Sequence, residues 1–111
     1  MANDFKNSIS ATVGTSRIEM YTTPSLTGTR SMLIGLEVCN IHTADVGITV
    51  EIWDDSASAW VNLTKALPVP VGSTASVIAG QKIVLEEDDK VAVTCDTAGG
   101  ASAILSILED V

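Results

Sequence analysis

The sequence predicts an all-β protein, a single antiparallel β-sandwich of about eight strands. Apolar and polar residues alternate with a period of two in several short stretches, which is the pattern of half-buried strands. Turn-forming residues separate these stretches about every 8–12 residues, as in sandwiches and barrels. No stretch shows the apolar stripe of an amphipathic helix. The chain has 111 residues, so residues 1–111 are expected to form one domain.

The expected strands follow one another with short turns between them. They span residues 8–13, 16–22, 31–40, 47–53, 59–64, 73–79, 81–85 and 90–95, with a ninth segment at 101–109. So many strands in one small domain must fold back as two packed sheets. The topology is therefore expected to be a jelly roll or an immunoglobulin-like Greek key, and the sequence leaves the strand order open.

Three segments indicate where their strands lie in the sheets. Residues 32–39 (MLIGLEVC) and 103–108 (AILSIL) are almost continuously apolar, which indicates central strands covered on both faces. Pro68 and Pro70 cannot donate to a strand ladder, so LPVPVG is expected at an edge or a crossover. Residues 1–7 are polar and weakly patterned. They are predicted to form an N-terminal arm that contacts a neighbouring subunit, with Phe5 as a candidate interface residue.

The composition limits the classes of partner. The chain has 14 acids and 6 bases, a net charge of −8, so a nucleic-acid partner is not expected. Charged residues make up 18% and hydrophobic residues 46%, which indicates that partners, including other copies of the chain, cover part of the surface. The alternative is an abundance of Ala, Thr and Val in two-sided sheets. No secretory signal or membrane span is visible, so synthesis in the cytoplasm and no membrane partner are expected.

The acidic run Glu86, Glu87, Asp88 and Asp89 is the strongest candidate for chemistry. Adjacent residues of a strand point to opposite faces, so at most two of these carboxylates converge, and the spacing of a calcium loop is missing. The run is expected to be a tight turn whose acids keep an edge soluble. Whether it binds an ion is left to a calcium titration. No metal, cofactor or catalytic residue is predicted.

Nucleophile and phosphate-binding motifs are absent from the sequence, since it contains neither G-x-S-x-G nor a P-loop. The two cysteines, Cys39 and Cys95, lie 56 positions apart within apolar strand patterns. Buried free thiols are therefore expected, with a disulfide as the alternative. His42 has no neighbouring motif that would make it a ligand or a base. The chain is predicted not to be an enzyme.

Trp53 and Trp60 flank the turn in WDDSASAW and are expected to form a cross-strand pair. If the inward face holds Ile48, Val50, Ile52, Val61 and Leu63, both tryptophans point outward. An outward pair can anchor a protein partner, form a platform for a carbohydrate, or pack under a loop. The protein anchor is favoured over the carbohydrate platform, because no polar residues obviously frame a sugar ring.

The C-terminal half contains the segment PVPVGSTASVIAGQKIVLEEDDKVAVTCDTAGGASAILSILED. The segment is similar to a pattern that consists of P-x-P-x-G-S, G-x-K-I-x-L-E-x-G-D and a final hydrophobic strand that ends in an acid. This pattern resembles that of small virion proteins of tailed bacteriophages. The strand ending in YTTP and the segment GLEVCN fit the front half of the pattern. Asp88 stands where the pattern has Gly, and Asp tolerates the left-handed region better than most residues.

The resemblance implies a non-enzymatic structural protein of the virion. Its leading form is a capsid decoration or cement protein that forms a homo-oligomer, with a trimer favoured, and binds the major capsid protein or another virion protein. A small tail, neck or fibre component is the alternative. A carbohydrate-binding module that uses Trp53 and Trp60 is the second alternative and belongs to a different class.

Overall fold

Eight strands make up the computed structural model, which describes residues 3–110 and their side chains except those at positions 3, 80, 81 and 110. The strands are β1 (Asn3–Val13), β2 (Ile18–Thr22), β3 (Arg30–Asn40), β4 (Val46–Asp54), β5 (Ala59–Val69), β6 (Thr74–Leu85), β7 (Lys90–Cys95) and β8 (Ala101–Asp110). Within these residues no helix is present. The predicted all-β class and the packing of two antiparallel sheets are confirmed.

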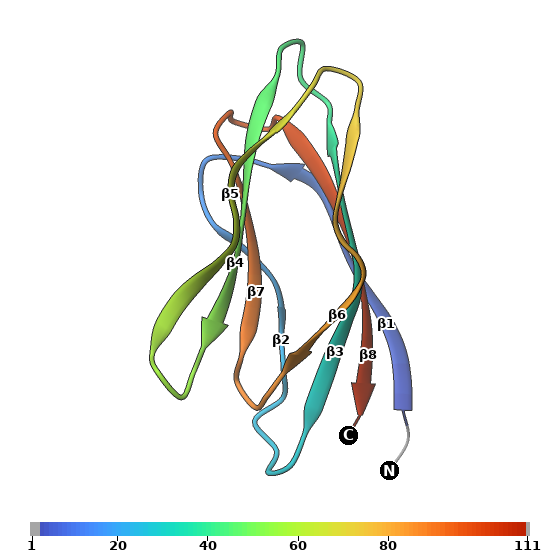
Figure 1. The fold of residues 1–111 in the computed structure, drawn as a ribbon, viewed down its shortest axis with the longest axis vertical. Helices are drawn as coiled ribbons and strands as arrows, with labels where there is room; N and C mark the ends of the chain where they lie inside the picture. Colours follow the sequence, from blue (N-terminus) through green and yellow to red (C-terminus); the bar gives the residue numbers. More distant parts are fainter. Residues whose placement is uncertain (1–2, 111) are drawn as a thin grey trace.

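Two four-stranded sheets form the sandwich, and their strand order is that of a jelly roll (Figure 1). The first sheet has the order β1-β8-β3-β6 and the second has the order β2-β7-β4-β5. The first strand pairs with the last, the second with the seventh, the third with the sixth and the fourth with the fifth. Such a pattern arises when one long antiparallel hairpin rolls up into two sheets. Of the two topologies that the sequence left open, the structure therefore has the jelly roll and not the immunoglobulin-like Greek key.

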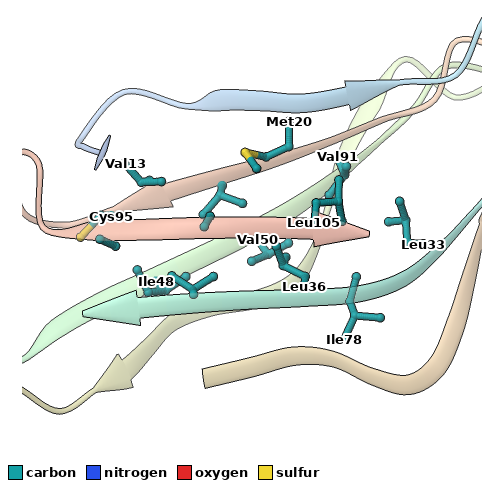
Figure 2. Close-up of a cluster of buried hydrophobic side chains, with 14 of the residues drawn as sticks. Val13, Met20, Leu33, Leu36, Ile48, Val50, Ile78, Val91, Cys95 and Leu105 are labelled. Atoms are coloured by element: carbon teal, nitrogen blue, oxygen red, sulfur yellow. The ribbon is translucent and has the colours of Figure 1, made fainter. Parts of the chain in front are cut away.

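The core lies between the sheets and is almost entirely aliphatic. The alternation of the strands sends every second side chain inward, where Leu36, Val50 and Leu105 meet (Figure 2). All three are fully buried. Each such side chain contributes about 1.5–3 kcal/mol relative to an exposed one. The chain therefore needs no disulfide for its core, and Cys39 and Cys95 are free thiols. Cys95 is buried as expected, while Cys39 is only half-buried.

The N-terminal segment differs from the prediction. Residues 3–7 are not an arm, because they belong to β1 and pair in register with β8, from Asn3 opposite Asp110 onward. Residues 1–2 lie outside the described part. The polar pattern was misleading because only one side of β1 faces the sandwich and its partner strand is about a hundred residues away in the sequence. Contact of this segment with a neighbouring subunit stays a prediction.

Two other strands are longer than expected because they contain bulges. Residues 73–79 and 81–85 form one strand, β6, whose register against β3 shifts between Ala79 and Ile83. β5 continues past residue 64 to Val69, with two register shifts against β4. A bulge adds a residue without ending the strand. Pro68 lies in β5 at the edge of the second sheet, as its missing N–H requires.

The central strands β3 and β8 are covered on one face only. Leu33, Leu36 and Val38 of β3 are buried, while Met32 and Ile34 on the other side are half-exposed. The expectation that these strands are covered on both faces is therefore wrong for the single chain. Apolar residues on both sides of a strand remain consistent with a partner on the outer face.

Candidate functional site

The acidic run forms the tight turn between β6 and β7, as predicted. The Asp89 N–H donates to the Glu86 carbonyl at 3.0 Å, and Asp88 has a positive φ of 63°. Asp is one of the residues that tolerates this region. The position is therefore one at which Gly would be less strained.

The carboxylates of this turn bind the neighbouring loops. Asp89 accepts from the backbone N–H of Glu86 and of Asp55, each at 3.0 Å. Glu87 accepts from the Gly28 N–H at 2.9 Å, and Asp88 accepts from the Ser25 hydroxyl. The acids therefore cap backbone groups of the β2–β3 and β4–β5 loops. Among the residues that the structure describes, no group of three or more potential metal ligands is found.

A network around Glu109 was not predicted from the sequence. Glu109 is buried near the end of β8, where it accepts from the Tyr21 hydroxyl and lies 2.9 Å from Lys6 Nζ. The Ser31 hydroxyl lies 2.8 Å from the Tyr21 oxygen and donates to it, because Tyr21 gives its own proton to Glu109. The network joins β1, β8, β3 and β2, and so connects the two sheets.

The network shifts the pKa values of its members in the directions that the contacts require. The hydrogen bonds from Tyr21 and Lys6 lower the pKa of Glu109, so the carboxyl is ionised. Burial, followed by the hydrogen bond to Glu109, raises the pKa of Tyr21 to about 12. The hydrogen bond and charge of Glu109 raise the pKa of Lys6. A period of two places Ala103, Leu105, Ile107 and Glu109 on one face, so an acid at an inward position was the signal in the sequence.

Trp53 and Trp60 form the predicted cross-strand pair. They are register partners of β4 and β5, and their ring centroids are 5.4 Å apart at a tilt of 57°. Arg17, in the loop between β1 and β2, lies over the Trp60 ring at 4.1 Å and makes two 3.1 Å hydrogen bonds to Glu51. The two tryptophans point outward, and Arg17 of the β1–β2 loop covers part of the Trp60 ring. The site therefore has features of both the outward pair and the pair packed under a loop.

The inward face that was expected beside the tryptophans is only partly correct. Ile48 and Val50 are fully buried, and Ile52 and Leu63 pack against the core. Val61 is 56% exposed. It lies on the edge strand β5, where the sandwich opens toward β6 and Val84. By register Val61 shares the face of its partner Ile52, but at this open edge it lines a hollow with Val84 and stays exposed.

The outer face of the first sheet carries a continuous line of apolar side chains across all four strands, which we call the apolar row. In register, the row consists of Phe5 of β1, Leu108 of β8, Met32 of β3 and Val84 of β6. Its two ends are strongly exposed, with Phe5 at 75% and Val84 at 58%. Beside Phe5 lies an open hollow lined in part by Asn7, Ile34 and Ser106.

A second apolar pair lies on the same outer face. Ile9 of β1 and Ile104 of β8 are directly opposite each other and are 64% and 49% exposed. Phe5, which was a candidate from the sequence, is thus one member of a larger apolar surface. The other members were missed because their alignment depends on the pairing of distant strands. The signal that could have shown them was the apolar character of both faces in residues 32–39 and 103–108.

Comparisons with known proteins identify the fold but no family. No protein-family model matches the chain, and no curated protein matches it. Among solved structures, the chain is similar to one from Bacillus endospore appendages, which are described as "a novel family of disulfide-linked pili". The TM-score is 0.58 at 14% identity, over 97% of this chain and 85% of the other. At this identity the likeness concerns the β-sandwich alone. Residues 3–110 contain no helix of the length and hydropathy that a membrane-spanning helix needs.

Proposed function

We propose that this protein is a non-enzymatic structural subunit that binds other protein chains within a larger assembly. The observation that carries the proposal is the apolar row on the outer face of the first sheet. Covering apolar surface contributes about 25 cal/mol per Å², and contiguous exposed apolar side chains mark interaction sites. The low charged fraction of 18% agrees with a surface that is partly covered.

Within this class, we propose a place in a phage particle. The leading form is a capsid decoration or cement protein bound to the outside of the assembled head, and a tail, neck or fibre component is the alternative. The support is the resemblance of the C-terminal half to virion proteins, together with the Asp88 turn at the position of the patterned glycine. A rigid sandwich with an exposed apolar sheet face suits the bridging of neighbouring capsid subunits.

Co-sedimentation of the purified protein with empty expanded capsids of the source phage tests this proposal. We expect saturable binding at many copies per particle. Met32→Lys and Val84→Glu, which place charges in the apolar row, should weaken binding at least about tenfold. Val71→Lys is the matched control, because Val71 is 52% exposed in the loop between β5 and β6, away from the row. Absence of binding by the wild-type protein contradicts the cement function.

The carbohydrate-binding alternative is tested separately. Arg17 covers part of the Trp60 ring, so less of the aromatic surface is left for a sugar ring to stack on. Glycan-array binding that disappears in Trp60→Ala but persists in Met32→Lys would support the carbohydrate alternative against the structural one.

A further inference from the structure

The four edge strands of the sandwich differ in how well they are protected against pairing with another chain. β5 and β6 each contain two register shifts, β5 also contains Pro68, and β2 has only five residues with one shift. In contrast, β1 is in unbroken register with β8 from Asn3 to Ser10, and its one shift lies after that stretch, between Ser10 and Val13. Bulges, prolines and shortness prevent edge pairing, and a long regular edge permits it. β1 is therefore the open edge of this fold, and it forms the outer border of the first sheet in Figure 1.

The side chains of β1 make this edge suitable for a protein partner. On the outer face, Phe5 and Ile9 are 75% and 64% exposed, the two highest values among the large apolar residues that the structure describes. They lie on either side of Asn7, two positions away in each direction. On the inner side, the charge of Lys6 is compensated by Glu109 at 2.9 Å. Residues 3–13 contain one acid and one base, so this edge is locally neutral on a chain whose net charge is −8.

We propose that β1 pairs antiparallel with β1 of a second copy of this chain, across a two-fold axis that passes through Asn7. The pairing joins two four-stranded sheets into one continuous sheet. Phe5 of each copy then lies opposite Ile9 of the other, and Lys6 lies opposite Ser8. Residues that face each other in this register have the same parity, so outer side chains meet outer side chains. The contact is isologous, meaning that both copies use the same surface, as in C2 dimers, the commonest homo-oligomers.

The register follows from comparing the neighbouring positions of the axis. An axis at Lys6 places two ammonium groups opposite each other, which is destabilising. An axis at Ser8 places Phe5 opposite Ala11 and leaves Ile9 opposite Asn7. An axis at Phe5 shortens the overlap of the described strand to residues 3–7. Of these axes, the one at Asn7 places the two strongly exposed apolar residues, Phe5 and Ile9, opposite each other, and it does so twice by symmetry. It also sets the two Asn7 amides within reach of a mutual hydrogen bond.

The proposed pairing also extends the apolar row. The row Val84–Met32–Leu108–Phe5 ends at the edge of the sheet, and the register places Ile9 of the second copy next in line. The pair that Ile9 forms with Ile104 continues the apolar surface into the second copy. A second copy is thus favoured over an unrelated partner, because β1 itself carries both Phe5 and the Ile9 that would face it. The inference deepens the proposed function by naming one of the partners.

Disulfide trapping tests the register. In a Cys39→Ser background, Asn7→Cys places one thiol from each copy at the axis, at the separation of directly opposite residues. We expect most of the oxidised protein to migrate as a dimer on a non-reducing gel. Ala11→Cys is the control, because its two thiols would be about 26 Å apart along the paired strands. Equal cross-linking of both variants, or none of Asn7→Cys, overturns the proposed pairing.

Sedimentation equilibrium tests the dimer itself. We expect Ile9→Lys to raise the dimer dissociation constant at least about tenfold, because it places an ammonium group opposite Phe5. Val71→Lys should leave the constant unchanged, and circular dichroism should show that both variants are folded. A wild-type trimer or monomer overturns the inference. A wild-type monomer that still co-sediments with capsids would overturn the dimer while leaving the proposed function intact.

Discussion

The environment of Glu109 depends on the complete fold. Its carboxylate accepts from Lys6 of the adjacent strand β1 and from Tyr21 of β2, which lies in the other sheet. Because its pKa is lowered in the folded state, the ionised carboxylate contributes stability that is fully present above its ordinary pKa of 4.5. That contribution is lost as the pH falls through the lower folded pKa.

Glu109→Gln is therefore expected to lower the melting temperature near neutral pH by about 5 °C or more. It should also reduce the loss of stability on acidification, since the titrating group is gone. Thermal unfolding at several pH values between about pH 7 and pH 3 measures both effects. Glu19→Gln is the control, because Glu19 is 47% exposed and its ion pair with Lys90 is 3.5 Å long. An unchanged acid profile in Glu109→Gln would contradict this account.

The titration of Tyr21 is a second way to test the same network. It can be followed by absorbance without interference, because Tyr21 is the single tyrosine of the chain. Its pKa is raised to about 12 in the folded state, so stability is lost as the pH rises above the ordinary value of about 10. We expect the ultraviolet absorbance of tyrosinate to appear with a midpoint of about 12. The midpoint should move downward in Glu109→Gln, which removes the negative charge beside the phenol.

Thr23 presents the opposite case, a buried polar group without a partner. The residue is fully buried, and among the buried side-chain polar atoms of the described residues its hydroxyl oxygen is the one without a hydrogen bond. Its backbone is paired, since its N–H donates to the Asp89 carbonyl at 2.9 Å. Thr23→Val keeps the shape and removes the unpaired hydroxyl.

Thr23→Val should raise the free energy of unfolding by about 1 kcal/mol, measured by urea denaturation. The exposed neighbour Thr22→Val should change it by less than about 0.5 kcal/mol. A loss of stability in Thr23→Val that is larger than in Thr22→Val would show that the hydroxyl does have a partner.

At the scale of elements, one bulge of the edge strand β5 places Ala66 in an unfavourable backbone conformation. Ala66 has a positive φ of 52° in β5, between the register positions Thr64 and Leu67. Its N–H donates to Thr49 Oγ1 at 3.1 Å, which fixes the distorted backbone. An alanine in this region costs about 1–2 kcal/mol relative to its preferred conformations, a cost that glycine largely avoids.

Ala66→Gly is expected to raise the free energy of unfolding by about 1 kcal/mol, because the native backbone is already in a conformation that glycine favours. Ala57→Gly, in the exposed turn before Ser58, is the control and should leave stability unchanged or lower it by up to about 1 kcal/mol. Thermal unfolding of the two variants under the same conditions compares them directly. A destabilised Ala66→Gly would indicate that the methyl group packs favourably at the bulge.

A strand could be predicted from the sequence when burial of its side chains produces a local pattern. It could not be predicted when the strand is held mainly by pairing with a distant strand. Residues 90–95 and 101–109 were predicted almost to the residue, the first from its alternation and the second from its apolar run, because both strands lie in the middle of a sheet. The start of β1 was missed, since a polar edge strand is held mainly by backbone pairing with β8. The split at residue 80 was a bulge rather than a turn. The Trp53–Trp60 pair was predictable because a short turn joins its strands, whereas Glu109 and Tyr21 are 88 positions apart.

At the scale of the molecule, the rolled hairpin brings the two ends of the described chain together. Asn3 lies opposite Asp110 in the ladder, and both ends lie at the same end of the sandwich (Figure 1). The order of the strands in space would be unchanged if a short turn joined β8 to β1 and the chain were opened elsewhere. The fold is therefore expected to tolerate circular permutation.

A permutant that joins Asp110 to Asn3 and opens the turn between Asp54 and Ala59 should fold, with a melting temperature within about 10 °C of the wild type. A second permutant, opened at Thr49 inside β4, is the control and should fail to fold cooperatively, since it divides a central strand of the second sheet. Circular dichroism during heating distinguishes them. Equal behaviour of the two permutants would contradict the importance that we assign to β4.

The asymmetry between the regular edge of β1 and the bulged edges of β5 and β6 also determines where growth of an assembly stops. Pairing through a two-fold axis uses the same edge on both copies, so a dimer has no further β1 to offer and is self-limiting. Endless polymerisation through sheet edges would require β1 to meet a different edge, and the bulges interrupt that ladder. A particle that recruits such a dimer receives two apolar rows in a fixed relative orientation, and the second binding event becomes intramolecular.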